Sequence, residues 1–278
     1  SERADPIGDE AYSPVKGIVH RYPDRVLLKP IMVCPVYCRF CFRREMVGDA
    51  DGTLTEAELS EALAYVSGAP AVREIVVTGG DPLMLQPNRL AAVVERVARI
   101  PHVEVLRFHT RVPVADPGRV TQVLAAALRP PPEAGLAVWL AVHVNHPREL
   151  SPIARRALGT LADAGLPLLS QTVLLKGVND DASILEALFR ALVRNRVRPY
   201  YLHHPDLARG TRHLRPTIAE GRAIVKSLRG RLTGIAQPTY VLDIPGGAGK
   251  VPIGPEWWDG ERGEVEDWKG RRHRYPPG

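Results

Sequence analysis

The sequence is poor in cysteine, with only three in 278 residues. All three lie within one short stretch, at positions 34, 38 and 41. An odd number of cysteines in a single tight motif argues against a disulfide framework and indicates a reducing compartment. The sequence also shows no signal-peptide pattern and no apolar run long enough to span a membrane. We therefore expect a cytoplasmic protein without a membrane partner.

Lysine is also scarce. The chain has six lysines among 37 basic residues, so arginine carries most of the net charge of +6. A basic balance can indicate a nucleic-acid partner. Here the arginines are scattered, and no basic run is interleaved with aromatic residues, which argues against nucleic acid. Small anionic ligands such as phosphate or carboxylate suit scattered arginines equally well.

Apolar runs alternate with segments of helical spacing along most of the chain. The runs with strand character cover residues 25–34, 74–78, 103–109, 137–144, 167–175, 198–204 and 239–243. The helical segments between them cover residues 55–67, 87–99, 118–128, 152–164, 182–193 and 217–229. This α/β alternation predicts parallel strands in a full or partial barrel of about six βα units. A doubly wound open sheet is the alternative, but it requires a switch point that the sequence does not show.

No internal repeat or domain-sized linker interrupts this pattern, so the sequence predicts one domain over residues 1–278. Its expected parts are an extended lead-in (1–24), the barrel (25–243), and a glycine-rich loop with a tail (244–278). The tail is charged and holds three tryptophans, at positions 257, 258 and 268. We expect it to fold back onto the body or to reach a partner. Polar residues follow the strands, and in a barrel such strand ends share the catalytic face.

The cysteines are spaced C-x₃-C-x₂-C, as Cys34, Cys38 and Cys41. Three thiolates this close can hold an iron–sulfur cluster and leave one iron open for a ligand. A chance group of buried cysteines is the alternative, and the absence of any other cysteine argues against it. His143 and His146 follow a strand and could bind a metal. No second set has ligand spacing, so a structural metal is not expected.

Two glycine-containing turns stand out. Gly79-Gly80-Asp81 follows an apolar strand, and its glycines allow close backbone approach to a ligand, although an ordinary turn explains it as well. The run from Pro245 to Lys250 fails the phosphate-loop pattern, because valine follows the lysine and no helix begins there. A lysine on such a loop can form a Schiff base with pyridoxal phosphate, or it can simply be solvated.

Two further groups of charged side chains are candidates for ligand binding. Arg21, Tyr22 and Arg25 place two guanidinium groups and a phenol within five residues, which suits a phosphate or a surface ion-pair cluster. Asp206 and Asp243 follow late strands. Two carboxylates that face one cavity suit a cationic ligand group, and ordinary turn residues are the alternative.

Taken together, these runs resemble one known family. The segments HRYPDRVLL, CRFCFRR, TGGDPL, VNHP, LLKGVND, RPYYLHHPD and DIPGGAGK are similar to those of the lysine 2,3-aminomutase family of radical S-adenosylmethionine enzymes. They occur in the same order from about His20 to Lys250, and Tyr37 stands at the usual aromatic place of the cysteine motif. A pyridoxal lysine in the same chain makes this resemblance much more specific than the three cysteines alone.

The resemblance implies a partial (β/α)6 TIM-like barrel of the radical SAM type. It also implies three cofactors, which are a 4Fe–4S cluster, S-adenosylmethionine and pyridoxal 5′-phosphate. The residues matched to the cluster are Cys34, Cys38 and Cys41, and those matched to S-adenosylmethionine are Gly79, Gly80, Asp81, Arg111, His143 and Gln171. Lys250, Arg21, Tyr22 and Arg25 match the pyridoxal phosphate contacts, and Arg43, Asp206 and Asp243 match the substrate contacts.

The activity that the resemblance implies is an isomerase reaction, in which the α-amino group of L-lysine moves to Cβ to give β-lysine. Lys250 is the expected catalytic residue, and an electron donor such as flavodoxin or ferredoxin is an expected partner. Two buried carboxylates without a cation would be costly, so Asp206 and Asp243 favour lysine over glutamate. They exclude arginine or another basic amino acid less well.

The chain departs from longer family members, whose additional cysteines bind a structural zinc at a subunit contact. Asp181 stands where one such cysteine is expected, so we predict no zinc, and a homodimer or higher homo-oligomer is still expected. Two alternatives stay open. One is an aminomutase for another basic amino acid, or one whose product modifies a translation factor. The other is a nucleic-acid-binding iron–sulfur protein with a basic, tryptophan-rich tail.

Overall fold

The computed structural model describes residues 2–48 and 52–276. Nine strands form one sheet, and their order in space follows their order in the chain. The strands are β1 (Ile18–Tyr22), β2 (Arg25–Ile31), β3 (Glu74–Gly79), β4 (Val105–Thr110), β5 (Ala137–His143), β6 (Leu168–Val173), β7 (Val197–His203), β8 (Thr239–Ile244) and β9 (Gly249–Pro252). Strands β2 to β8 pair in parallel, while β1 and β9 pair antiparallel at the two edges.

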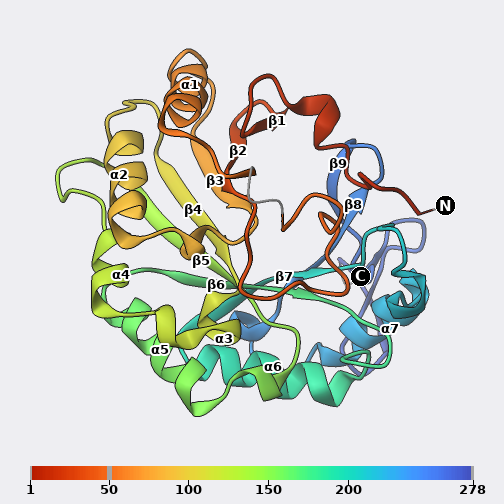
Figure 1. Cartoon of the computed structure of the whole chain (residues 1–278). Coiled ribbons are helices and arrows are strands. Elements are labelled where there is room, and N and C mark those ends of the chain that lie inside the picture. The colour runs from red at the N-terminus through yellow and green to blue at the C-terminus, as the bar shows by residue number, and fades with distance from the viewer. Residues whose placement is uncertain (1, 49–51, 277–278) are drawn as a thin grey trace.

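Helices follow the parallel strands and cover the outer face of the curved sheet (Figure 1). They are α1 (Glu56–Ser67), α2 (Pro87–Ala98), α3 (Val112–Ala115), α4 (Gln122–Ala127), α5 (Pro152–Asp163), α6 (Ala182–Arg194) and α7 (Ile218–Leu228). The segments between β2 and β8 therefore make six βα units, which confirms the predicted partial (β/α)6 barrel. Because the strand order is strictly sequential, the sheet has no switch point, and the doubly wound alternative is wrong.

Local sequence explains most of these elements. The strand β3 is buried along almost its whole length, with Ile75 and Val77 fully covered, as expected for a parallel strand between helices and barrel interior. Helix α1 begins at Thr55, whose hydroxyl accepts from the Glu58 backbone while the Glu58 carboxylate accepts from the Thr55 backbone. This reciprocal cap satisfies two amides that the helix itself leaves unpaired.

The predicted helix over residues 118–128 is wrong in its bounds. The structure has the short helix α3, a 3-10 turn at Pro117–Arg119, and then the separate helix α4. Thr121 is extended, and its hydroxyl accepts from the Leu124 backbone, so a new helix starts after it. A cap residue inside the apolar pattern therefore divided what looked like one helix.

The lead-in over residues 1–24 is more ordered than an extended segment. It contains β1, which turns through Pro23 and Asp24 into β2. Residues 2–12 before it, here called the N-terminal strap, run between β9 and β1 (red in Figure 1). The amide of Arg3 donates to Leu207 at 2.8 Å, and the carbonyl of Pro6 accepts from Gly246 at 3.0 Å. On the other side, the Ile7 carbonyl accepts from the Arg21 guanidinium of β1 at 2.6 Å. The strap thereby bridges the two edges of the sheet, which do not pair with each other in the described chain.

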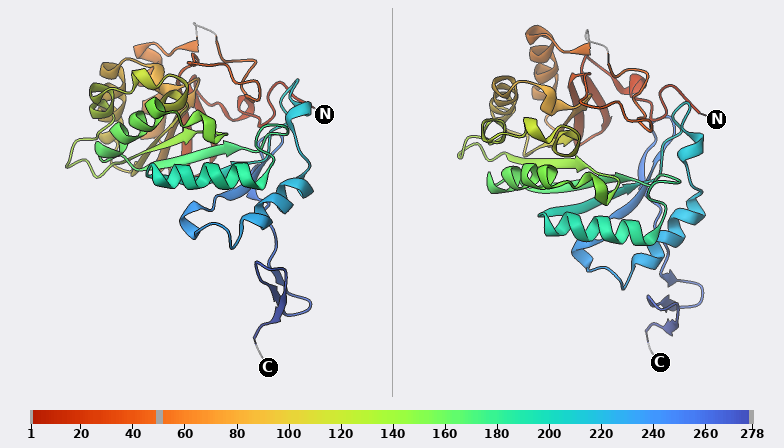
Figure 2. Two further views of the ribbon diagram at one scale, coloured as in Figure 1. Left: turned by 90° about the horizontal axis from the view of Figure 1, so that it is seen from below. Right: turned by 60° about the horizontal axis from the view of Figure 1, so that its bottom comes forward.

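The tail forms a small antiparallel sheet of β10 (Trp258–Asp259), β11 (Glu264–Glu266) and β12 (Arg272–Arg274), which projects from the barrel (Figure 2). It contacts the body at α7. The Lys226 ammonium pairs with Glu266 at 2.5 Å and lies 5.7 Å from the Trp257 ring centre. Arg222 of α7 also pairs with Glu256 at 3.5 Å, and the Trp268 ring lies against Gly230, so the tail folds back onto the body at α7 and just after it. The single-domain assignment of residues 1–278 stays a prediction.

Candidate active site

A cavity of about 630 Å³ runs along the barrel interior to the carboxyl ends of the strands. Every site residue that the resemblance implies lines it, whereas the candidate metal ligand His146 does not. The lining residues are Arg21, Tyr22, Arg25, Cys34, Cys38, Cys41, Arg43, Gly79, Gly80, Asp81, Arg111, His143, Gln171, Asp206, Asp243 and Lys250. The structure therefore brings together residues from the first 25 positions and from position 250. It does not by itself assign their ligands, so their individual roles stay predictions.

The cysteine loop lies directly after β2. All three thiols are free and partly accessible from the cavity. Burial raises the pKa of the Cys34 thiol to about 12, with Asp81 and the neighbouring thiols adding to the rise, and burial also raises the pKa of Cys41. Burial therefore disfavours the thiolate form of Cys34 and Cys41, a cost that a positively charged metal centre would compensate.

Gly79 and Gly80 serve the cysteine loop through the backbone. The Gly80 amide donates to the Ile31 carbonyl at 2.7 Å, and the Asp81 amide donates to the Val33 carbonyl at 2.9 Å. A Cβ on Gly80 would lie 2.5 Å from the Val33 oxygen, and Gly79 has φ of +108°. The sequence predicted close approach to a ligand. The structure shows that these glycines also allow the end of β3 to approach the backbone segment that leads into Cys34.

The carboxylate of Asp81 is fully engaged by the protein. It accepts from the Thr110 hydroxyl at 2.7 Å and from three backbone amides, those of Leu83, Arg111 and Val112, at 3.1, 2.6 and 3.2 Å. Burial outweighs these hydrogen bonds and raises its pKa. Asp81 therefore joins the ends of β3 and β4.

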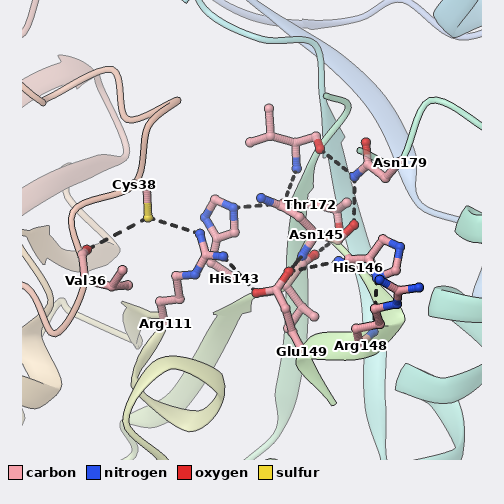
Figure 3. Close-up of polar contacts among 12 residues, drawn as sticks. Val36, Cys38, Arg111, His143, Asn145, His146, Arg148, Glu149, Thr172 and Asn179 are labelled. Carbon is pink, nitrogen blue, oxygen red and sulfur yellow. Dashed lines mark hydrogen bonds and ion pairs between the residues drawn. The ribbon is translucent and has the colours of Figure 1, made fainter. Parts of the chain in front are cut away.

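Arg111 connects the cysteine loop to β5 (Figure 3). Its guanidinium donates to the Cys38 sulfur at 3.0 Å and to the Glu149 carboxylate at 2.8 Å. The other oxygen of Glu149 accepts from the backbone amides of Asn145 and His146 at 2.8 and 2.9 Å. Sequence reasoning missed Glu149. The spacing of a cap residue, proline and glutamate after the strand was the available signal.

The two histidines of this region have different roles. Burial lowers the pKa of His143 to about 3, and its Nε2 lies 3.0 Å from the Asn145 side-chain oxygen. His146 instead caps a 3-10 turn, since its Nδ1 accepts from the Arg148 amide at 3.1 Å. In residues 2–48 and 52–276, no three His, Cys, Asp or Glu side chains are grouped so that they could hold a metal ion.

Asp181, which stands where the longer family members are expected to have a zinc-binding cysteine, caps helix α6. Its carboxylate accepts from the amides of Ser183 and Ile184.

Lys250 lines the same cavity from β9, a strand that the sequence did not predict. It is the direct cross-strand partner of Asp243 on β8, and its ammonium pairs with the Asp243 carboxylate. The ammonium is also 3.3 Å from Nδ1 of His203, and the Lys250 amide donates to the Tyr22 hydroxyl at 2.7 Å. Burial acts to raise the pKa of Asp243, but His203 and Lys250 outweigh it and hold that pKa at about 2.

Asp206 is the exception in this charged group. Its Oδ1 is buried and has no hydrogen-bond partner in the part of the chain that the structure describes. Burial, followed by the nearby charge of Asp243, raises its pKa to about 7. An unsatisfied buried oxygen costs roughly 1–3 kcal/mol. The position therefore fits a cationic ligand group.

Two arginines that line the cavity meet at Asp9, which sequence reasoning missed. Its carboxylate accepts from Arg43 at 2.8 Å and from Arg21 at 3.1 Å. Burial acts to raise the pKa of Asp9, yet the cationic neighbours, Arg43 first, lower it overall. The Nε of Arg21 is buried without a partner in the described residues, so an unused donor points to an anionic ligand here. Arg25 stacks 3.8 Å above the Tyr22 ring.

Comparison with known proteins identifies the family. The profile of the radical SAM superfamily matches residues 28–188, and that of lysine-2,3-aminomutase matches residues 225–259. A putative L-lysine 2,3-aminomutase of Aquifex aeolicus is 39% identical over 267 residues, which cover 92% of this chain and 71% of that protein. The chain belongs to the lysine 2,3-aminomutase family of the radical SAM superfamily.

Other family members are similar over most of this chain. The L-lysine 2,3-aminomutase of Fusobacterium nucleatum is 42% identical over 91% of this chain and 59% of its own length. The glutamate 2,3-aminomutase of Clostridioides difficile is 34% identical over 96% of this chain and 65% of its own length. The chain thus spans about 60% of the length of the first curated relatives it matches. A radical SAM methyltransferase from Sphaerobacter thermophilus shares the fold, with a TM-score of 0.53 and 24% identity over 81% of this chain and 68% of that one.

Proposed function

We propose that this chain is a radical SAM, pyridoxal-phosphate-dependent aminomutase, an isomerase that moves the α-amino group of L-lysine to Cβ to give β-lysine. The observation that carries the proposal is a single cavity lined both by the cysteine loop and by Lys250, where a carboxylate oxygen of nearby Asp206 has no partner among the described residues. Family membership supports the reaction type, and the geometry of the charged groups supports the substrate.

The residues present fit the three implied cofactors. Cys34, Cys38 and Cys41 would hold the 4Fe–4S cluster, with S-adenosylmethionine at its open iron. Lys250 would hold pyridoxal phosphate, and the unused Arg21 donor fits its phosphate. When bound, the cluster and S-adenosylmethionine supply a radical that removes hydrogen, and pyridoxal phosphate carries the migrating nitrogen.

Within the cavity, the chain's own residues orient the amino acid and limit its motion. Arg43, at 6% exposure, is proposed to bind the substrate carboxylate. Asp206 and Asp243 are proposed to bind the distal ammonium group. Holding both ends of an extended amino acid fixes which carbon faces the radical source, and such positioning is the main contribution a protein makes to this class of reaction.

Charge balance favours lysine over glutamate. Asp206 and Asp243 supply two carboxylates, while Lys250 supplies one ammonium group. The pKa of neighbouring His203 is lowered by burial and by Lys250, so that its ring is neutral near pH 7. A second ammonium group from the substrate would balance the site. A distal carboxylate would add a third negative charge in a buried position, at a high desolvation cost.

The test is turnover by the anaerobically purified, cofactor-loaded chain with L-lysine, L-ornithine, L-arginine and L-glutamate, followed by chiral product analysis. We expect β-lysine as the main product and no β-glutamate. A fully loaded protein that converts glutamate faster than lysine would refute the substrate assignment. Turnover of ornithine or arginine above lysine would favour the alternative basic substrates.

Partners and location are proposed on more general grounds. Reduction of the cluster calls for a small electron donor such as flavodoxin or ferredoxin, and a homodimer is proposed in keeping with the resemblance. No helix in residues 2–48 and 52–276 is long and apolar enough to cross a membrane. A cytoplasmic location is proposed from the three free thiols.

A further inference from the structure

The N-terminal strap delivers one buried carboxylate, Asp9, to the junction of two ligand-binding arginines. The Asp9 side chain is 1% exposed, and those of Arg43 and Arg21 are 7% and 11% exposed. The two guanidinium groups come from different segments, Arg43 from the end of the cysteine loop and Arg21 from β1. Among the hydrogen bonds of the described residues, Asp9 is the one residue that contacts both guanidinium groups.

The strap fixes where this carboxylate lies. Its first residue in the structure, Glu2, accepts from the amides of Gly210 and Thr211 at 2.9 and 3.1 Å. Gly8, immediately before Asp9, has φ of +70°, and a Cβ there would lie 2.9 Å from the Gly246 backbone. The strap is therefore anchored to the loop after β7 and to the turn between β8 and β9, and Asp9 has little freedom to follow a displaced arginine.

Each arginine keeps donors that Asp9 does not use. In Arg43, Asp9 binds Nε and the Thr78 hydroxyl accepts from one terminal nitrogen at 3.3 Å, which fixes the plane of the guanidinium. In Arg21, Asp9 and the Ile7 carbonyl share one terminal nitrogen, while Nε is unpartnered in the described chain. Guanidinium groups recognise carboxylates and phosphates by geometry, so their orientation sets affinity.

We propose that Asp9 is a positioning residue that orients Arg43 toward the substrate carboxylate and Arg21 toward the cofactor phosphate. This inference rests on the proposed function, and it adds a residue of the strap to the binding site. One carboxylate thereby couples the two anion-binding positions. Displacing the strap would loosen both at once.

Two physical effects of removing the Asp9 charge have opposite signs, which makes the inference testable. A more positive site attracts anions more strongly, so a purely electrostatic role predicts tighter phosphate binding in Asp9→Asn. Loss of orientation predicts weaker binding, because each arginine loses a charge-assisted hydrogen bond that fixes it. The sign of the change in affinity therefore decides between the two roles.

The experiment titrates the apoprotein with pyridoxal phosphate and, separately, with pyridoxal, and follows the visible absorption. In Asp9→Asn we expect the dissociation constant for pyridoxal phosphate to rise about tenfold, with little change for pyridoxal. In the loaded enzyme we expect a rise of similar size in the KM for lysine and a smaller change in kcat. Glu10→Gln, which changes the neighbouring exposed carboxylate, is the matched control and should behave as wild type.

Asp9→Glu provides a second measurement if Asp9→Asn fails to fold. It keeps the charge and shifts the carboxylate by one methylene, so orientation predicts binding several-fold weaker than wild type, whereas a purely electrostatic role predicts no change. Wild-type or tighter binding by a folded Asp9 variant overturns the inference while leaving the proposed function intact. Failure of the wild-type apoprotein to bind pyridoxal phosphate refutes the proposed function and this inference with it.

Discussion

Two regions of the cavity, one around the cysteine loop (here the cysteine end) and one around Lys250 (here the lysine end), are built on different principles. At the cysteine end, hydrogen bonds within the protein occupy the carboxylates, as in Asp81 with four donors and Glu149 with three. At the lysine end, two buried polar atoms, Oδ1 of Asp206 and Nε of Arg21, have no hydrogen-bond partner among the residues that the structure describes. At the cysteine end, the protein itself satisfies the carboxylates, and this hydrogen-bonded frame presents the thiols to the cavity. The lysine end is electrostatically incomplete and is therefore suited to select a charged ligand.

The largest effect is expected on cluster content, from the loss of a cysteine at the cysteine end. Cys38→Ala should reduce iron and acid-labile sulfide to background after anaerobic reconstitution, because two cysteines are too few for a four-iron cluster in this loop. Arg39→Ala, one residue away and exposed, is the control. A Cys38→Ala protein with the full iron and sulfide content would show that the thiol is not a cluster ligand.

A comparably large effect is expected at the lysine end. Lys250→Ala should remove the covalent attachment of pyridoxal phosphate, so that borohydride treatment leaves no pyridoxyl group on the protein by mass spectrometry. Lys176→Ala changes an exposed lysine and should keep the attachment. A pyridoxyl group retained on the Lys250→Ala chain would move the attachment to another lysine.

An intermediate effect is expected from the proton on Asp206. Its pKa of about 7 means that the carboxyl is protonated below that pH and cannot hold an ammonium group. The KM for lysine should therefore rise about tenfold per unit as the pH falls below the pKa. Asp206→Asn should have a high KM that no longer follows pH in this range. An unchanged pH profile in this variant would exclude Asp206 as the group responsible.

The same group affects stability with a definite sign. Folded protein keeps the proton on Asp206 up to about pH 7, whereas the unfolded chain releases it near the ordinary value of 3.8. The folded state binds more protons within this window. The contribution of Asp206 to the free energy of unfolding therefore falls as pH rises through the window, and Asp206→Asn should remove that component in urea unfolding.

The smallest effect is expected at Glu149, which is hydrogen-bonded within the protein at the cysteine end. Glu149→Gln weakens the contacts to Arg111 and to two backbone amides, and it should lower the free energy of unfolding by about 1–2 kcal/mol. Iron content should stay close to wild type, because no cysteine is lost. Glu95→Gln on the exposed face of α2 is the matched control. Equal stability of the two variants in urea would contradict the role of Glu149 as a connecting residue.

Elements of structure that depend on a few neighbouring residues could be predicted from the sequence. The alternation of apolar runs and helical segments predicted the βα units, because burial of a parallel strand or a helix face depends on nearby side chains. Strand β9 was missed, since its four residues directly follow a glycine-rich loop and become a strand only by pairing with β8. That pairing also sets Lys250 opposite Asp243, a contact that no local pattern indicates.

The sequence by itself determined the order of the elements, the cysteine spacing and the few residues able to bind anions, cations and a cluster. Tertiary structure alone decided how they are used. Asp9 reaches Arg43 across 34 positions because the strap crosses the open edge of the sheet, and Gly80 packs against the backbone of Val33 because β2 and β3 are neighbours. Such contacts depend on strand register and chain path, and these follow from packing the whole barrel rather than from any single segment.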